Sequence, residues 1–120
     1  MSNDFRLEDW TVRPRRACIE RDDETVHIHP KSMAVLTCLA AAAGEVVTRD
    51  ELFEAVWPGV IVTDDALTQC VVELRKAFGD QARNPRFIKT IPKVGFCLVP
   101  PVSGLDEEQA GSGSKLKFFT

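Results

Sequence analysis

Hydrophobic and polar residues alternate in short runs near the start of the chain and recur at helical spacing in its middle. Three early runs are partly alternating, at 5–13, 17–21 and 25–30. Charged residues and Pro14 separate these runs, a pattern that is typical of short β-strands. We therefore predict a small antiparallel sheet at the N-terminus, with the sequence RDDET as a hairpin turn.

Two helices are predicted after this sheet. The first begins at Pro30, whose missing N–H is no loss in a first turn, and ends at Gly44. A brief extended link is expected at 45–47. The second helix begins after Thr48, which together with a glutamate three residues later matches a capping box. It should end near Trp57, because a proline follows and disfavours helical geometry in the residue before it.

A third helix is predicted at 64–78. Thr63 supplies an N-cap hydroxyl, two aspartates lie at the positive end of the helix dipole, and a Gly-Asp pair closes the helix. One side is apolar, since four side chains project within about 60° of one another at roughly 100° per residue: Leu67, Val71, Leu74 and Phe78. Two β-prone runs within 87–99 then flank the turn sequence PKVG, so a hairpin with Lys93 at or near its tip is expected.

This order of elements predicts an α+β fold, a winged helix-turn-helix with an N-terminal antiparallel sheet, three helices and a C-terminal β-hairpin wing. The chain of 120 residues is long enough for one domain with its own core, which we assign to 1–100. The remainder, 101–120, contains GSGS and is expected to be a flexible tail, a linker or an engineered addition.

The cysteines and histidines do not indicate a metal site. The four cysteines have no close pairs, whereas a zinc site or a disulfide framework usually has them, and reduced thiols are expected. His27 and His29 alternate along a predicted strand and could point the same way, but no third ligand accompanies them. No nucleophile elbow or phosphate-binding glycine loop is present. We therefore expect no enzyme activity, no metal and no cofactor.

Positive charge is concentrated in one quarter of a chain whose net charge is −3. Segment 69–99 holds six basic and two acidic side chains, a net charge of +4. Segment 31–68 holds two basic and six acidic side chains, a net charge of −4. Because the distribution of charge decides where a polyanion binds, this pattern permits a nucleic-acid partner despite the acidic total.

The third helix has a face suited to reading DNA bases. A helix in the major groove packs one side on its own domain and leaves the other free. The residues opposite or beside the apolar side of 64–78 are chemically mixed and can contact base edges: Asp65, Thr68, Gln69, Val72 and Glu73. Lys76 shares this face. Glu73 could instead form an ion pair with Lys76, three residues further along the same surface.

The sequence VW before the loop, ALTQ and LRKAFGD in the third helix, and NPRFIKTIPKVGF in the hairpin resemble the OmpR/PhoB-type DNA-binding domain, in particular its CadC-like branch of bacterial transcription regulators. The resemblance covers roughly residues 5–100. It implies sequence-specific binding of double-stranded DNA, with the helix at 64–78 in the major groove and the wing at 87–99 against the minor groove.

The resemblance also implies individual roles. Trp57, Arg75 and Thr90 match positions that hold phosphates in the family, and Lys93 is assigned to the minor groove. Each has a simpler alternative: Trp57 could be a core aromatic, Lys93 an ordinary turn residue, and the Arg75–Lys76 pair a solvated last turn that complements the helix dipole.

The resemblance further implies contact with RNA polymerase through the loop 58–62. Because a single copy buries modest area on DNA, we also expect paired or tandem copies on repeated half-sites. It implies a cytoplasmic location, with a membrane span and a sensor expected beyond Thr120. The alternative is a winged-helix protein-interaction module without DNA binding, for which the acidic segment 31–68 would be the natural face.

Overall fold

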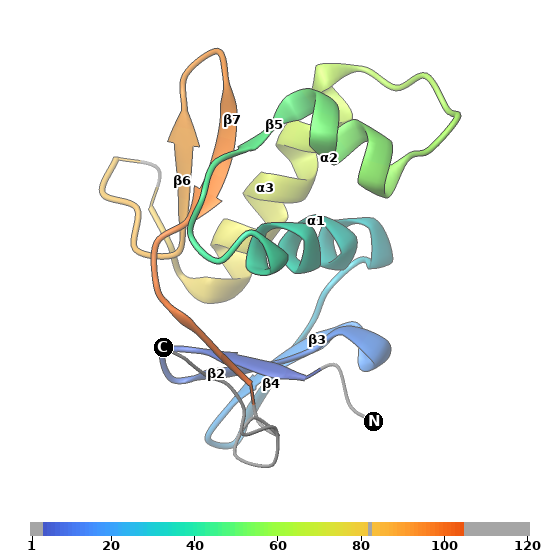
Figure 1. Cartoon of the computed structure of the whole chain (residues 1–120). Coiled ribbons are helices and arrows are strands. Elements are labelled where there is room, and N and C mark those ends of the chain that lie inside the picture. The colour runs from blue at the N-terminus through green and yellow to red at the C-terminus, as the bar shows by residue number, and fades with distance from the viewer. Residues whose placement is uncertain (1–3, 82, 105–120) are drawn as a thin grey trace.

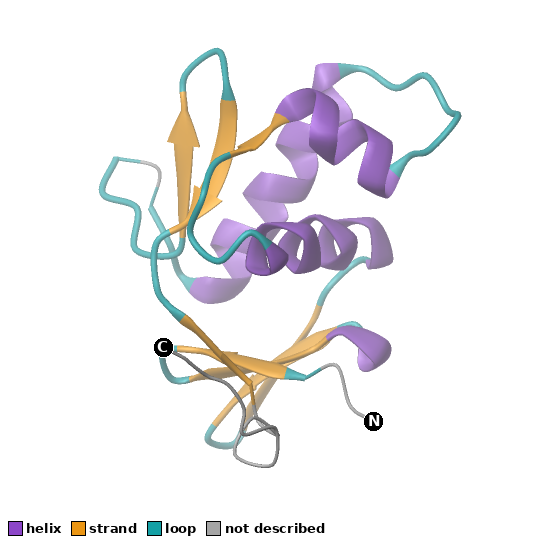
Figure 2. Cartoon of the chain, in the orientation of Figure 1, coloured by secondary structure: helices purple, strands orange, loops and turns teal. Residues whose placement is uncertain are grey.

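The computed structural model describes residues 4–81 and 83–104. One antiparallel sheet forms the base, the helices rest on it, and a smaller second sheet flanks the helices (Figures 1 and 2). The elements in chain order are β1 (Phe5–Leu7), β2 (Trp10–Arg13), the short 3-10 helix η1 (Pro14–Arg16), β3 (Cys18–Arg21), β4 (Glu24–His27), α1 (Pro30–Ala41), β5 (Val47–Thr48), α2 (Arg49–Val56), α3 (Asp64–Phe78), β6 (Ile88–Ile91), β7 (Gly95–Leu98) and β8 (Val102–Gly104). The predicted fold class is confirmed.

The base sheet is antiparallel, with strand order β4-β3-β2-β1-β8. The run predicted at 5–13 forms two strands rather than one, because the chain turns at Glu8, whose φ is 58°. The RDDET turn joins β3 to β4 as predicted, with Asp22 at a φ of 52°.

Strand β8 lies beyond the predicted end of the domain at residue 100. It pairs with β1 through Val102 and Leu7, among other partners, so the folded region extends to at least Gly104. The boundary predicted at 100 is therefore wrong by a few residues, since the dipeptide Pro100-Pro101 interrupts the chain without ending the fold. The remainder of the predicted tail, 105–120, lies outside the described residues.

The first two helices begin as their sequences predict. Pro30 occupies the first turn of α1, and the helix ends at Ala41, just before Ala43 and Gly44 adopt positive φ values. At α2 the predicted capping box is confirmed. The Glu51 N–H donates to the Thr48 hydroxyl at 3.1 Å, and the Glu51 carboxylate accepts from the Thr48 N–H at 2.8 Å.

Helix α3 has the predicted bounds, and Gly79 closes it in a left-handed conformation with a φ of 73°. Its N-terminus differs in one respect: Thr63 is the N-cap residue, but its hydroxyl makes no capping hydrogen bond, so that prediction is wrong. The two aspartates of the first turn remain at the positive end of the helix dipole.

An aromatic cluster fixes the C-terminal end of α3 against both sheets. Phe78 meets Trp10 of β2 edge-on, with 5.7 Å between ring centroids, and stacks on Phe87 at 4.6 Å. Phe87 immediately precedes β6, so three segments that are distant in sequence are packed at one point. Aromatic pairs of this kind add about 0.5–1.5 kcal/mol beyond their burial of area.

The second sheet has strand order β5-β7-β6. Strand β5 was predicted only as an extended link, and its pairing with β7 depends on Gly95. A Cβ atom at Gly95 would overlap the Val47 carbonyl oxygen and lie 2.8 Å from the Thr48 Cα. Glycine is thus required here for the close approach of two backbones.

Candidate nucleic-acid interface

The outer side of α3 carries a continuous exposed stripe. Five side chains recur at helical spacing and are exposed, while the opposite side of the helix is buried: Asp65, Thr68, Gln69, Val72 and Lys76. None of the polar ones forms a hydrogen bond or ion pair with the residues that the structure describes. We call these five residues the α3 stripe. The structure brings together four of the five predicted base-reading residues.

Glu73 is not part of this stripe, and its placement there was wrong. Its carboxylate accepts the His29 N–H at 2.8 Å and the Ser32 hydroxyl at 2.6 Å, both at the N-terminus of α1. The first turn of α1 contains no acidic residue, so Glu73 supplies from α3 the negative charge that the helix dipole favours. No ion pair joins Glu73 to Lys76 within the described part of the chain, so the alternative role is not observed either.

Asp80, the other acidic residue of segment 69–99, is also engaged with backbone. Its carboxylate accepts three N–H groups where the chain enters β6: Arg86 at 2.7 Å, Phe87 at 3.2 Å and Ile88 at 3.0 Å. Both carboxylates of the segment are therefore held inside the fold, whereas its exposed charges are basic: Lys76, Arg83, Arg86, Lys89 and Lys93. Of these, Arg86 lies 3.8 Å from the Glu8 carboxylate.

Arg75 and Thr90, both expected to hold phosphates, contact each other. The Arg75 guanidinium donates through Nη2 to the Thr90 hydroxyl at 2.8 Å and to the Ile88 carbonyl at 3.0 Å. Arg75 is half-buried, and its Nε is buried with no partner among the described residues. Thr90 is exposed.

Lys93 is exposed at the tip of the wing in a left-handed conformation, with a φ of 64°. The turn is closed by a hydrogen bond of 3.0 Å from the Val94 N–H to the Ile91 carbonyl, with Pro92 and Lys93 as the central residues. Such a turn favours glycine at its third position, where this chain has lysine. Gly95 belongs to the sequence PKVG that was predicted as the turn, but it lies outside the hydrogen-bonded turn and serves the contact with β5.

The wing turn is tied to the start of α2, since the Arg49 N–H donates to the Val94 carbonyl at 3.1 Å. The Arg49 guanidinium lies 3.7 Å from the Asp64 carboxylate, at the start of α3. Arg49 therefore adds a cation between the wing tip and the α3 stripe, and the sequence analysis missed it. The available signal was a basic residue in the first turn of a helix, where the dipole disfavours positive charge.

Trp57 follows α2 and is half-buried, with its ring centroid 6.0 Å from that of Phe53. No hydrogen bond joins its indole N–H to another of the described residues. The ring therefore packs on the domain and keeps a donor available, which is compatible with both of its predicted roles.

The buried thiols are neutral. Burial raises the pKa of Cys70 on α3, and likewise the pKa values of Cys18 and Cys38, above the ordinary value of 9.0. A protonated thiol is neither a ready nucleophile nor a metal ligand. Among residues 4–81 and 83–104, no group of three or more His, Cys, Asp or Glu side chains could hold a metal ion. His29 lies outside β4 and caps α1, where its Nδ1 accepts from the Lys31 N–H at 3.4 Å.

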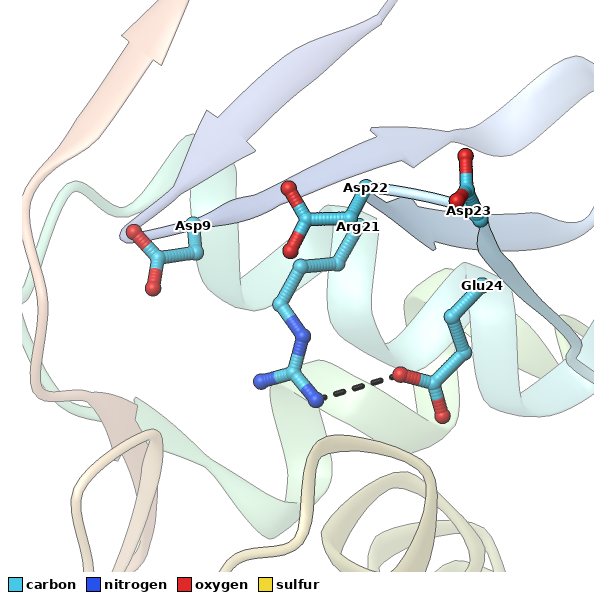
Figure 3. A pocket seen from close by; sticks show the side chains of 5 residues that line it. All are labelled: Asp9, Arg21, Asp22, Asp23 and Glu24. Atoms are coloured by element: carbon cyan, nitrogen blue, oxygen red, sulfur yellow. Dashed lines mark hydrogen bonds and ion pairs between the residues drawn. The ribbon is translucent and has the colours of Figure 1, made fainter.

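An acidic cavity lies on the base sheet, at the end of the molecule opposite the wing tip (Figures 1 and 3). It is lined by Asp9, Asp22, Asp23, Glu24 and Arg21. Arg21 is bonded to Glu24 at 3.1 Å, and its guanidinium lies 4.3 Å from the Trp10 ring. The carboxylates that line this cavity disfavour a polyanion there.

Residues 23–98 match the family model described as "Transcriptional regulatory protein, C terminal". The chain is 37% identical over 105 residues to the transcriptional activator CadC of Escherichia coli K12, covering 87% of this chain and 20% of CadC. The chain thus spans about a fifth of the length of that relative. In the described part of the chain, no helix is long and apolar enough to cross a membrane.

Two solved structures are similar. The DNA-binding domain of Escherichia coli CadC matches with a TM-score of 0.75 and 34% identity, covering 87% of this chain and 99% of that one. The Klebsiella pneumoniae RstA DNA-binding domain in complex with the RstA box matches with a TM-score of 0.70 and 26% identity, covering 82% and 98% of the two chains.

Proposed function

Because the chain belongs to the family of transcriptional regulatory protein C-terminal domains, the OmpR/PhoB-type winged-helix DNA-binding domains, we propose that it binds a specific sequence of double-stranded DNA as part of a bacterial transcription regulator. Relatives that are transcription regulators, and a similar domain solved with its DNA box, support this function over a protein-interaction module without DNA binding.

The α3 stripe lies in the major groove in this proposal. Gln69 can bond adenine through two hydrogen bonds, and Val72 can meet a thymine methyl group. Thr68 offers both a hydroxyl and a methyl group, and Asp65 can accept from cytosine N4. The mixed chemistry of this surface suits discrimination between bases more than attachment to the sugar-phosphate backbone of the DNA.

Attachment to the backbone comes from residues around the stripe. Trp57, Lys76 and Thr90 donate to phosphates, and Lys93 at the wing tip enters the adjacent minor groove. Contacts of this kind fix the register of the protein on the duplex.

One observation carries the proposal: the α3 stripe is exposed and free of partners beside a cationic wing tip, while both carboxylates of segment 69–99 are bonded to other parts of the fold. Within segment 69–99 the exposed charges are therefore all cations, which suits the approach of a polyanion.

The test is selection of a binding site from random duplexes, followed by affinity measurements at several salt concentrations. The logarithm of the affinity should fall with the logarithm of salt concentration with a slope set by roughly 4–6 phosphate contacts, at about −0.9 per contact. Gln69→Ala should cost about 1–3 kcal/mol and relax the preference at one base pair. Arg16→Ala, on exposed η1 of the base sheet, is the matched control and should bind as the unaltered protein does. A salt-independent affinity would contradict the proposal.

We further propose that the loop 58–62 contacts RNA polymerase. Val60 is 59% exposed and Ile61 is 100% exposed, which is unusual for adjacent large aliphatic residues on a loop. Ile61→Ser should lower activated transcription in a reconstituted assay and leave DNA affinity unchanged. Loss of DNA affinity in this variant would show instead that the loop supports the fold.

The location and assembly of the whole regulator are also proposals. We infer that this domain acts in the cytoplasm as the head of a longer, membrane-anchored protein, and that two copies bind repeated half-sites because one domain of this size buries modest area on DNA. The gene sequence beyond Thr120 tests the first point. The number of domains bound per selected duplex, measured by analytical ultracentrifugation, tests the second.

A further inference from the structure

Arg75 is held differently from the other cations of segment 69–99. Lys76 and Lys93 are exposed and have no partner among the described residues, whereas Arg75 is half-buried and folded against β6. Its Nη2 is shared between the Ile88 carbonyl and the Thr90 hydroxyl, at 3.0 and 2.8 Å. The buried, unpartnered Nε shows that the inner part of the guanidinium lies below the surface.

The partners of Arg75 explain what it does for the wing. Strand β6 is the edge strand of the second sheet, and Ile88 turns both backbone groups toward the end of α3. The Ile88 N–H donates to Asp80 at 3.0 Å and its carbonyl accepts from Arg75. Arg75 and Asp80, on either side of the α3 C-terminus, therefore both bond to Ile88 of β6. These bonds set the position of the wing relative to the α3 stripe.

The bond to Thr90 also determines the direction of a proton. A threonine hydroxyl has one hydrogen and two acceptor lone pairs, whereas a guanidinium only donates. Because Thr90 accepts from Arg75, its own hydrogen points away from Arg75, and no described residue receives it. Thr90 is exposed, so this hydrogen lies at the surface, where a group outside the protein can accept it.

We propose that Arg75 is a positioning residue, which fixes β6 against α3 and directs the Thr90 hydroxyl at a DNA phosphate without contacting the DNA itself. The proposal rests on the DNA-binding function above and replaces the direct phosphate contact that the family resemblance implied for Arg75. The positive guanidinium behind the hydroxyl also polarises the O–H bond, which makes it a better donor to an anion.

A double-mutant cycle on the selected duplex tests this proposal. Thr90→Val removes the hydroxyl with little change of shape, and Arg75→Met removes both hydrogen bonds while keeping an apolar stem. We expect each single variant to bind about tenfold more weakly, and the double variant to bind no more weakly than the weaker single one, because both remove the same contact. Thr90→Ser keeps the hydroxyl and should restore most of the affinity.

The salt dependence separates positioning from direct contact. Removal of a cation that touches a phosphate lowers the slope by about 0.9, so Arg75→Met should leave the slope unchanged while Lys76→Ala lowers it. A lower slope in Arg75→Met, additive losses in the double variant, or an unchanged affinity in Arg75→Met would each overturn the positioning role.

Circular dichroism would detect misfolding of Arg75→Met. In that case Arg75→Lys provides the test instead. Lysine keeps the charge but cannot reproduce the planar guanidinium geometry, so a loss of affinity at unchanged slope is expected. Full binding by Arg75→Lys would overturn the proposal. Failure of the DNA-binding function is a separate result: the unaltered protein would then select no duplex or show no salt dependence.

Discussion

The two ends of the molecule use the same kinds of residues in opposite ways. On the base sheet, charged side chains pair with one another: Arg13 lies 2.6 Å from Asp4 and 2.8 Å from Glu20, and Arg21 binds Glu24. At α3 and the wing, the carboxylates of Glu73 and Asp80 bond mainly to backbone N–H groups, and the cations at the surface are left exposed. The partners of the acidic residues, rather than the number of basic ones, therefore decide which surface can attract a polyanion.

The largest effect is expected at the base of the wing. Gly95→Ala would force the strands β5 and β7 apart, because the added Cβ overlaps the Val47 carbonyl oxygen. Overpacking against backbone should lower the free energy of unfolding by roughly 3 kcal/mol, at the upper end for such changes, as measured by urea denaturation. Gly59→Ala is the control: it adds the strain of a left-handed residue at φ 72°, which Gly95 does not have, but meets no atom within 4 Å. Equal losses in the two variants would mean that the close approach is unimportant.

The second effect separates a structural from a base-reading carboxylate. Glu73→Ala removes the partner of the buried Ser32 hydroxyl and of the His29 N–H, which should lower the free energy of unfolding by about 1–3 kcal/mol. Glu54→Ala, exposed on α2, should change it by less than about 0.5 kcal/mol. The base preference of Glu73→Ala, determined by site selection, should match that of the unaltered protein. A changed preference at one base pair would show that Glu73 does contact a base.

At Lys93, the stability of the fold and the affinity for DNA are expected to change in opposite directions. Lys93→Gly relieves a left-handed conformation and should raise the free energy of unfolding by roughly 1 kcal/mol. The same change should weaken DNA binding, because the contact of the lysine with the minor groove is lost. Lys93→Ala should weaken binding equally without the gain in stability. A glycine variant that is more stable and binds normally would remove Lys93 from the interface.

The smallest effect is expected at the acidic end. Replacing Asp22 and Asp23 by Asn removes two negative charges from the cavity of Figure 3. The molecule is 40 Å long, and charges are screened over about 8 Å at physiological salt. DNA affinity should therefore be unchanged at that salt concentration and rise slightly only at low ionic strength. A large gain at physiological salt would show that DNA passes close to the base sheet.

Local sequence signals predicted the elements that carry the interface. The capping box at Thr48, the bounds of α3 and the apolar side of α3 all depend on residues within one or two turns of each other. The side of α3 left exposed followed from that spacing alone, which is why Asp65, Thr68, Gln69, Val72 and Lys76 were found together. Their roles toward DNA stay predictions.

Signals that depend on distant partners were missed or misassigned. Strand β5 has only two residues and acquires its hydrogen bonds from β7, and β8 acquires its own from β1, nearly 100 residues earlier. Gly95 was assigned to the nearby turn because the strand that it accommodates lies 47 residues away in the chain. Glu73 was placed on the reading face because its true partners belong to α1.

By itself, the sequence determined where the helices begin and end, which side of α3 is apolar, and that positive charge gathers in its second half. Caps, prolines and amphipathic spacing act through bonds and contacts between near neighbours, so they can be recognised along the chain. Tertiary structure alone decided which charged side chains remain exposed. Glu73, Asp80 and Arg75 are as polar in sequence as Lys76 and Lys93, but packing places backbone donors or acceptors from other elements within 3.2 Å of each of them. A charged group with such a partner is bonded within the fold. One without such a partner stays exposed, where it can contact solvent or DNA.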